Sequence, residues 1–109
     1  MNDLASKHCS PQQGSALTRD AAETLLEQLA GWTLSADAKE IRRTFAFKDY
    51  YRSMAFVNAV AWIAHREDHH PDMTVGYNKV TVAFSTHSVS GLSENDFIGA
   101  AKIDALGAA

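Results

Sequence analysis

The sequence predicts an α+β domain with three helices packed on one face of a four-stranded antiparallel sheet. Apolar residues recur at helical spacing in three stretches and alternate with polar residues in others, and turn-forming residues separate these stretches. The resulting order is α-β-β-α-β-β-α, which favours an antiparallel sheet whose helices cover one side. The chain has 109 residues, enough for one domain with its own core.

The first fourteen residues differ in character from the rest of the chain. They are rich in serine, glutamine, proline and glycine, and they hold too little apolar surface to offset the entropy cost of ordering them. We therefore expect residues 1–14 to form a flexible tail and residues 15–109 to form a single folded domain.

The first helix and the first strand pair follow this segment. Thr18 can cap a helix that Gly31 stops. The buried stripe of this helix comprises Ala22, Leu25, Leu26 and Leu29. Residues 32–35 then form a short extended piece, and residues 40–47 alternate as a strand that pairs with it in a hairpin.

The second helix is the most apolar element. Asp49 can cap it, and it should run to about Glu67. Between Met54 and Ala64 it is apolar on nearly every side, so it needs two partners. We expect one side to cover the sheet and the other to meet a second subunit, because an exposed apolar surface is a liability. That surface comprises Phe56, Val60, Trp62 and Ile63.

The second strand pair and the last helix complete the domain. Pro71 disfavours helical geometry at the residue before it, so the long helix should already have ended there. Residues 73–77 and 79–85 form two strands joined by a tight turn. Ser93 and Asp96 are spaced as a capping box that opens the last helix.

Composition excludes several classes of partner. The formal net charge of −3 gives no basic field for a phosphate backbone, which argues against direct nucleic-acid binding. Cys9 is the only cysteine, so an intrachain disulfide is impossible and a reducing, cytoplasmic setting is expected. The start of the chain lacks an apolar signal segment, and the longest apolar run is shorter than the ~20 residues that span a bilayer. We expect a soluble protein without membrane contact.

Three histidines stand where helix and strand patterns end. His69 and His70 directly precede Pro71 on the loop after the long helix, and His87 follows the last strand. Neutral imidazole both donates and accepts a proton near pH 7, and it also binds metal ions. The cluster therefore indicates acid/base catalysis or metal ligation.

Two other interpretations of the histidines stay open at this point. His65 and His69 are four residues apart, as in helical zinc motifs, but Arg66 stands where such a motif has a glutamate and no cysteine lies nearby. The histidines can also be scattered surface residues, with His65 only complementing the dipole of the helix.

A spaced series of residues runs through the second half of the chain. It comprises His65, His69, His70, Pro71, Tyr77, His87 and Asp96. This series resembles the signature of the pterin-4a-carbinolamine dehydratases, a family also known as the dimerisation cofactor of a homeodomain transcription factor. Supporting similarity occurs at residues 29–32, 47–50, 77–80, 85–87 and 91–93. The resemblance covers about residues 17–106 and makes residues 15–109 a dehydratase-like domain.

The resemblance implies an activity and an assembly. Members of the family remove water from 4a-hydroxytetrahydropterin to give quinonoid dihydropterin, with neither a metal nor an organic cofactor. The product is recycled for aromatic amino-acid hydroxylases, so a hydroxylase is an implied partner, and the subunits form homodimers or homotetramers. Loss of the 4a-hydroxyl group needs a proton for the leaving oxygen and removal of a proton from a ring nitrogen. Imidazoles with a pKa of about 6.5 can do both.

The resemblance also assigns roles within the site. His69 and His87 are the implied acid/base pair, and His70 is mainly a donor that orients the substrate. Pro71 fixes the loop. Groups that face the pterin come from His69, His70, Pro71, Thr86, His87, Ser88 and Val89. His65 and Asp96 support the site, and Asp96 either holds an imidazole tautomer or only caps the last helix.

Two positions depart from the pattern of the family. His65 stands where the family often has an acidic residue, and Met73 stands where it often has an aromatic one. A carboxylate raises the pKa of a neighbouring imidazole, whereas a histidine does not, so the charge balance of the site should differ. We expect pterin packing near Met73 to be altered and not lost.

Two further functions compete with the dehydratase. The apolar second helix suits a protein-interaction module that binds a partner helix, as animal members of the family do with their transcription factor. The histidine cluster also leaves a metal-dependent hydrolase open, which stoichiometric metal analysis would test.

Overall fold

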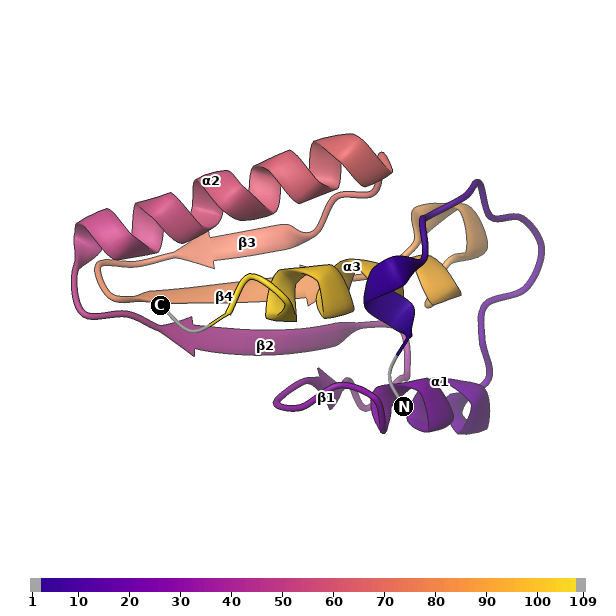
Figure 1. Cartoon of the computed structure of the whole chain (residues 1–109). Coiled ribbons are helices and arrows are strands. Elements are labelled where there is room, and N and C mark those ends of the chain that lie inside the picture. The colour runs from indigo at the N-terminus through magenta and orange to yellow at the C-terminus, as the bar shows by residue number, and fades with distance from the viewer. Residues whose placement is uncertain (1–2, 108–109) are drawn as a thin grey trace.

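A computed structural model describes residues 3–107, and it confirms the α+β class and the order of the elements (Figure 1). The helices are α1 (Arg19–Leu26), α2 (Tyr50–Glu67) and α3 (Glu94–Asp104), and the strands are β1 (Thr33–Leu34), β2 (Ile41–Ala46), β3 (Asp72–Val75) and β4 (Lys79–Phe84). Two short 3-10 helices, η1 (Leu4–Ser6) and η2 (His87–Val89), add to the predicted set. The strands pair antiparallel in the order β1-β2-β4-β3.

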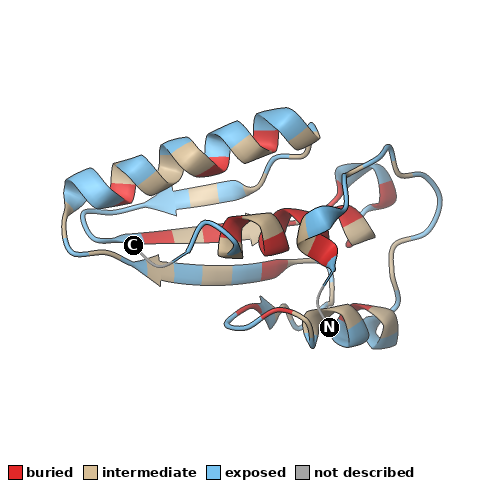
Figure 2. Cartoon of the chain, viewed as in Figure 1, coloured by how far each residue is buried: buried red, intermediate tan, exposed pale blue. Residues whose placement is uncertain are grey.

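Alternation along the strands gives the sheet one apolar face and one polar face. Ile41 pairs with Phe84 and Phe45 pairs with Val80, and these side chains point toward the helices. The opposite face carries polar pairs such as Thr44 and Thr81, whose hydroxyl oxygens are 2.8 Å apart. Helices α2 and α3 pack against β4 and against each other, and α1 lies beside β1. Buried residues accordingly concentrate in β4 and α3 (Figure 2).

Side-chain caps set the starts of all three helices where the sequence predicts them. Thr18 accepts a hydrogen bond from the backbone of Ala21, and Asp49 accepts one from the backbone of Arg52. Ser93 and the residue three positions on form a reciprocal capping box at α3. Helix α2 ends at Glu67, also as predicted.

The first helix is shorter than predicted. It ends at Leu26, and tight turns with i to i−3 backbone bonds occupy the residues before Gly31. These turns still bury Leu29, which is 6% exposed, so the apolar pattern continues although the helix does not.

Residues 3–14, the described part of the predicted tail, run along the helical side of the domain and contact it at several points (Figure 1). Leu4 is 1% exposed and belongs to the core, where η1 contacts α3. The Nζ of Lys102 donates a hydrogen bond to the backbone oxygen of Ala5. The contacts of this segment are one deeply buried leucine and backbone hydrogen bonds to side chains far away in the sequence. The remaining tail residues, 1–2, and the chain end, 108–109, lie outside the described residues.

The outer surface of α2 is apolar but differs from the predicted one. Val60 is buried against the sheet, and Phe56 and Ile63 are half-buried. The exposed apolar groups of α2 are the rings of Tyr50, at 54% exposure, Tyr51, at 80%, and Trp62, at 60%. No helix within residues 3–107 is long and apolar enough to cross a bilayer.

Candidate active site

A cleft of about 490 Å³ lies where four chain segments meet. These segments are the end of α2 with the loop after it, the end of β4 with η2, the start of α3, and the N-terminal segment. Its lining comprises Cys9, Ser10, Pro11, Gln12, Glu67, Asp68, His69, His70, Pro71, Asp72, Ser85, Thr86, His87, Ser88 and Asn95. The cleft therefore joins the two loops on which the predicted catalytic histidines lie.

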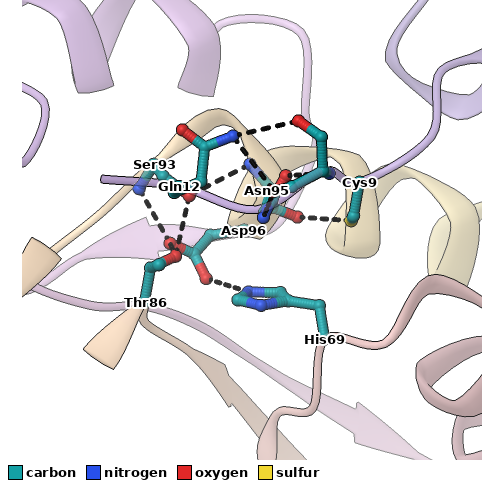
Figure 3. Close-up of polar contacts among 8 residues, drawn as sticks. Cys9, Gln12, His69, Thr86, Ser93, Asn95 and Asp96 are labelled. Atoms are coloured by element: carbon teal, nitrogen blue, oxygen red, sulfur yellow. Dashed lines mark hydrogen bonds and ion pairs between the residues drawn. The ribbon is translucent and has the colours of Figure 1, made fainter. Parts of the chain in front are cut away.

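The imidazole of His69 is held on three sides. Asp68 adopts a left-handed backbone conformation, with φ of 53°, which ends α2 and turns the chain into the loop. The His69 ring stacks nearly parallel on Phe84, with 5.7 Å between the centroids. Its Nε2 lies 2.6 Å from Oδ1 of Asp96 (Figure 3). The ring position is thus fixed by helix end, strand end and carboxylate together.

Asp96 is fully buried and orients this imidazole while it also caps α3. Its Oδ2 accepts hydrogen bonds from the backbone N–H of Ser93, at 3.0 Å, and from the hydroxyl of Thr86, at 2.7 Å (Figure 3). Its Oδ1 pairs with the ring of His69. The two roles that the sequence offered as alternatives for Asp96 are therefore combined, one on each carboxylate oxygen.

This arrangement fixes the tautomer of His69. An ionised carboxylate only accepts hydrogen bonds, so the hydrogen between the two groups belongs to Nε2 of the imidazole. In the neutral ring the lone pair then lies on Nδ1. Within residues 3–107 no protein group forms a hydrogen bond with Nδ1, which leaves this nitrogen for a ligand.

The other predicted site residues divide into two groups. His70 and His87 are exposed side chains that line the same cleft as His69, with Pro71 and Ser88 beside them. Buried Thr86 also lines it, through the side chain that donates to Asp96.

Val89 and His65 lie elsewhere. Val89 is buried, its N–H is bonded to the backbone oxygen of Thr86, and it does not line the cleft. His65 is exposed on α2 beside Trp62, with 5.8 Å between the ring centroids, and it also lies outside the cleft lining. Because the helix ends at Glu67, His65 and His69 do not form the i, i+4 pair of a helical metal motif. Residues 3–107 contain no group of three or more His, Cys, Asp or Glu side chains arranged to hold a metal ion.

Among the polar lining residues that were not predicted as site residues, Glu67 and Asn95 hold the N-terminal segment in place. Glu67 is the last residue of α2, and Asn95 immediately precedes Asp96. Their side chains bond to the N-terminal segment, so their role depends on contacts between residues far apart in sequence. The only local signal was their position next to predicted site residues.

Burial and hydrogen bonding set the charge of two groups beside the cleft. Burial of Glu67 opposes its ionisation, but the N–H of Cys9, the ring of His8 and the ammonium of Lys102 together hold the pKa of Glu67 below its usual 4.5. Burial, with the nearby Glu67 carboxylate, raises the pKa of the Cys9 thiol to about 12. Glu67 is therefore a carboxylate and Cys9 a neutral thiol near pH 7.

Taken together, these features define an α+β protein with a cleft in which the imidazole paired with Asp96 shares one cavity with the imidazoles of His70 and His87. A sequence profile of the family described as "Pterin 4 alpha carbinolamine dehydratase" matches residues 15–106. The chain belongs to this family.

Named relatives agree with this assignment. A protein of Nitrosospira multiformis is 57% identical over 108 residues, which cover 97% of this chain and 94% of that protein. A protein of Stenotrophomonas maltophilia is 58% identical over 105 residues, covering 94% of this chain and 90% of the other. Both are assigned by name to pterin-4-alpha-carbinolamine dehydratase.

Solved structures share the fold. The transcriptional coactivator/pterin dehydratase from Brucella melitensis superposes with a TM-score of 0.80 and 35% identity, over 84% of this chain and 98% of that chain. A pterin dehydratase-like protein described as a RuBisCO assembly factor in the alpha-carboxysome gives a TM-score of 0.62 and 25% identity, over 72% of this chain and 93% of that one.

Proposed function

We propose that the protein is a hydro-lyase that dehydrates 4a-hydroxytetrahydropterin to quinonoid dihydropterin by histidine acid/base catalysis, as part of pterin recycling. The observation that carries this proposal is the His69–Asp96 pair, set in the same cleft as His70 and His87 in a chain of the dehydratase family. Three imidazoles with access to one ligand can supply and remove the protons that the reaction moves.

The proposed chemistry uses both loops. Nδ1 of His69 removes a proton from a ring nitrogen of the substrate, and Asp96 stabilises the imidazolium that forms. A protonated His87 gives its proton to the 4a-hydroxyl group, so the C–O bond breaks and water leaves. One proton is taken up and one is released, and the overall reaction is the loss of water alone. His70 donates a hydrogen bond that orients the pterin.

The charges of the cleft favour one class of pterin. Three of its lining residues are acidic, Glu67, Asp68 and Asp72, and none is a lysine or an arginine. An anionic substituent on the pterin would meet these like charges, and the lining offers no lysine or arginine to offset them. The proposed substrates are therefore pterins with neutral, hydrogen-bonding side chains.

The decisive assay follows the decay of the 4a-carbinolamine spectroscopically. We expect His69→Ala and His87→Ala each to lower kcat by about a hundredfold to ten-thousandfold, the range typical of a general acid or base. His65→Ala is the matched control, because this imidazole lies on α2 outside the cleft, and its kcat should stay near that of the unmodified protein. Unchanged acceleration in a folded His69→Ala/His87→Ala double variant would reject the proposal.

A second function rests on the exposed aromatic surface of α2. Tyr51 and Trp62 are eleven residues apart, about three helical turns, so they lie on the same side of α2. Both are mostly exposed, so a second copy of this chain can cover them in a homodimer or homotetramer. Two structural relatives are described as a coactivator and as an assembly factor, so partners other than pterins are known for the fold. The proposal also includes an aromatic amino-acid hydroxylase as the functional partner. It further includes a cytoplasmic location, which suits the free thiol of Cys9.

The test of this second function is separable from catalysis. Trp62→Glu should lower the mass of the protein in solution, measured by sedimentation, because subunits separate. The separated subunits should still catalyse dehydration. Partner binding that survives histidine substitution but is lost with Trp62→Glu would establish the interaction surface, and an unchanged mass would exclude α2 as the subunit contact.

A further inference from the structure

The N-terminal segment forms one wall of the cleft. Four consecutive residues, Cys9, Ser10, Pro11 and Gln12, line it together with the histidine loops. They lie outside the stretch that defines the family, because the family profile begins at residue 15. None of the roles assigned to the cleft so far involves them.

Glu67 anchors one end of this wall. Its Oε1 accepts a hydrogen bond of 2.7 Å from the backbone N–H of Cys9, and its Oε2 lies 3.0 Å from Nδ1 of His8. The ammonium of Lys102 is 3.8 Å from the same carboxylate. The side chain of Glu67 is only 7% exposed, so its contacts with the Cys9 N–H and with Lys102 are poorly screened by solvent, whereas the His8 ring is exposed.

Asn95 and Ser88 anchor the other end. The amide of Asn95 donates to the backbone oxygen of Ser10, at 2.7 Å, and accepts from its N–H, at 3.1 Å (Figure 3). The hydroxyl of Ser88 donates to the backbone oxygen of Gln12, at 2.9 Å. The peptide groups of the wall are therefore bonded to side chains of α3 and η2 and are held in one position.

The anchors connect the wall directly to the catalytic groups. Glu67 ends α2 two residues before His69, Asn95 is the neighbour of Asp96, and Ser88 follows His87. The wall is thus held by side chains that neighbour the residues of the site. The entropy cost of ordering the wall is met when the protein folds, before a ligand binds, which makes the wall a preorganised binding surface.

We propose that residues 9–12 are a substrate-binding wall of the cleft, which holds the pterin in place and controls its affinity, and that Glu67 and Asn95 are the positioning residues of this wall. The inference rests on the proposed function for its substrate. The wall offers a hydroxyl group, a carboxamide and backbone atoms, and the Gln12 amide already donates toward Ser10. Its one titratable group is the neutral Cys9 thiol, so the wall contributes binding and not proton transfer.

Steady-state kinetics of the full-length protein test the wall. A variant that combines Ser10→Gly, Pro11→Gly and Gln12→Gly keeps the Leu4 anchor and Cys9 but removes the side chains and the rigidity of the wall. We expect KM to rise about tenfold with kcat changed less than about twofold, because uniform binding is lost and chemistry is not. Lys7→Ala is the matched control, since Lys7 lies in the same segment but pairs with Glu94 outside the cleft.

The anchors are tested by a conservative pair. Glu67→Ala removes the acceptor of the Cys9 N–H and should also raise KM, whereas Glu67→Gln keeps an oxygen at that position and should restore most of the affinity. Equal KM values for the glycine variant, Glu67→Ala and the unmodified protein, all folded by circular dichroism, would overturn the inference.

Cys9 provides a readout that does not depend on activity, because it is the only cysteine of the chain. At pH 8 a thiol with a pKa of about 12 is ionised about a thousandfold less than one at the usual 9.0, so alkylation by iodoacetamide should be slow. Bound 7,8-dihydrobiopterin should slow it about tenfold further, since the pterin covers the wall. Glu67→Ala should speed it up for two reasons, because the variant removes a carboxylate that raises the pKa of the thiol and because the wall loosens, whereas protection by the pterin reports on the wall alone.

The two readouts separate this inference from the proposed function. Protection of Cys9 by 7,8-dihydrobiopterin without any acceleration of dehydration would support the wall and reject the dehydratase. Normal dehydration, with Cys9 alkylated at the same rate in the presence and absence of the pterin, would reject the wall and leave the dehydratase intact.

Discussion

Replacing the Asp96 carboxylate by an amide should invert the tautomer of His69 and remove most of the activity. The amide of Asp96→Asn carries one oxygen and one NH2 group. The amide can take two orientations. In the first, the NH2 group replaces Oδ2 and faces two hydrogen-bond donors, the N–H of Ser93 and the hydroxyl of Thr86. In the second, the NH2 group replaces Oδ1 and faces only Nε2 of His69, which can become an acceptor. The second orientation is therefore favoured, and it forces the ring hydrogen onto Nδ1.

The expected magnitude follows from the loss of the base. With its hydrogen on Nδ1, the neutral ring no longer offers a lone pair to the cleft, and kcat should fall by about a hundredfold to ten-thousandfold. KM should change little. The loss of charge-assisted hydrogen bonds to a buried carboxylate should cost about 1–3 kcal/mol of unfolding free energy.

The assay combines carbinolamine decay with nitrogen-15 shifts of the His69 ring, which report the tautomer directly. Asp104→Asn is the matched control, because this carboxylate lies on the same helix, bonded to Trp32 and Arg43 and outside the cleft. It should lower stability without lowering kcat. A folded Asp96→Asn protein with kcat within about threefold of the original would refute the reasoning, as would an unchanged tautomer.

Three further predictions follow from packing and charge. Gly99→Ala would place a methyl group 2.7 Å from Cζ of Phe84, the ring on which His69 stacks, so the unfolding free energy measured by urea titration should fall by about 1–3 kcal/mol. The control Gly76→Ala, whose methyl group would lie 3.5 Å from its nearest neighbour, should leave stability nearly unchanged. Equal stabilities of the two variants would contradict this prediction. The folded-state pKa of Glu67 lies below its usual 4.5, so the ionised Glu67 side chain stabilises the fold fully above pH 4.5, and this stabilisation is lost as the pH falls further. The urea midpoint of the unmodified protein should therefore drop more between pH 5 and pH 3 than the midpoint of Glu67→Gln. Parallel drops of the two midpoints would count against this role of Glu67. A pterin with a carboxylate or phosphate side chain should show a KM about tenfold higher than a neutral pterin, and this difference should shrink as the salt concentration rises. Equal KM values at low salt would show that the acidic lining does not select against anionic pterins.

Local signals in the sequence were enough to place the ends of the elements that carry the site. The cap at Asp49, the turn before Pro71 and the capping box at Ser93 depend on residues adjacent in the chain, and each is found where it was predicted. The alternation of β4 likewise predicted which side chains reach the core. These features put His69, His70 and His87 on loops, and the fold then brings the loops to one cleft.

Features that depend on distant contacts were not predictable in the same way. The pairing of His69 with Asp96 joins residues 27 positions apart, so the sequence left the role of Asp96 undecided. The N-terminal segment has a polar composition, and its order comes from side chains of α2 and α3 that composition does not reveal. His65 shares the family spacing but does not line the cleft, and it lies on α2, which ends at Glu67 before His69.

A crystal structure with bound 7,8-dihydrobiopterin tests the central claim most directly. The account predicts the pterin ring between His69, His70 and His87, with a ring nitrogen within hydrogen-bonding distance of Nδ1 of His69. A pterin ring bound outside this cleft would contradict the account. So would a pterin ring that makes no hydrogen bond with Nδ1 of His69 and lies too far from His87 for proton transfer.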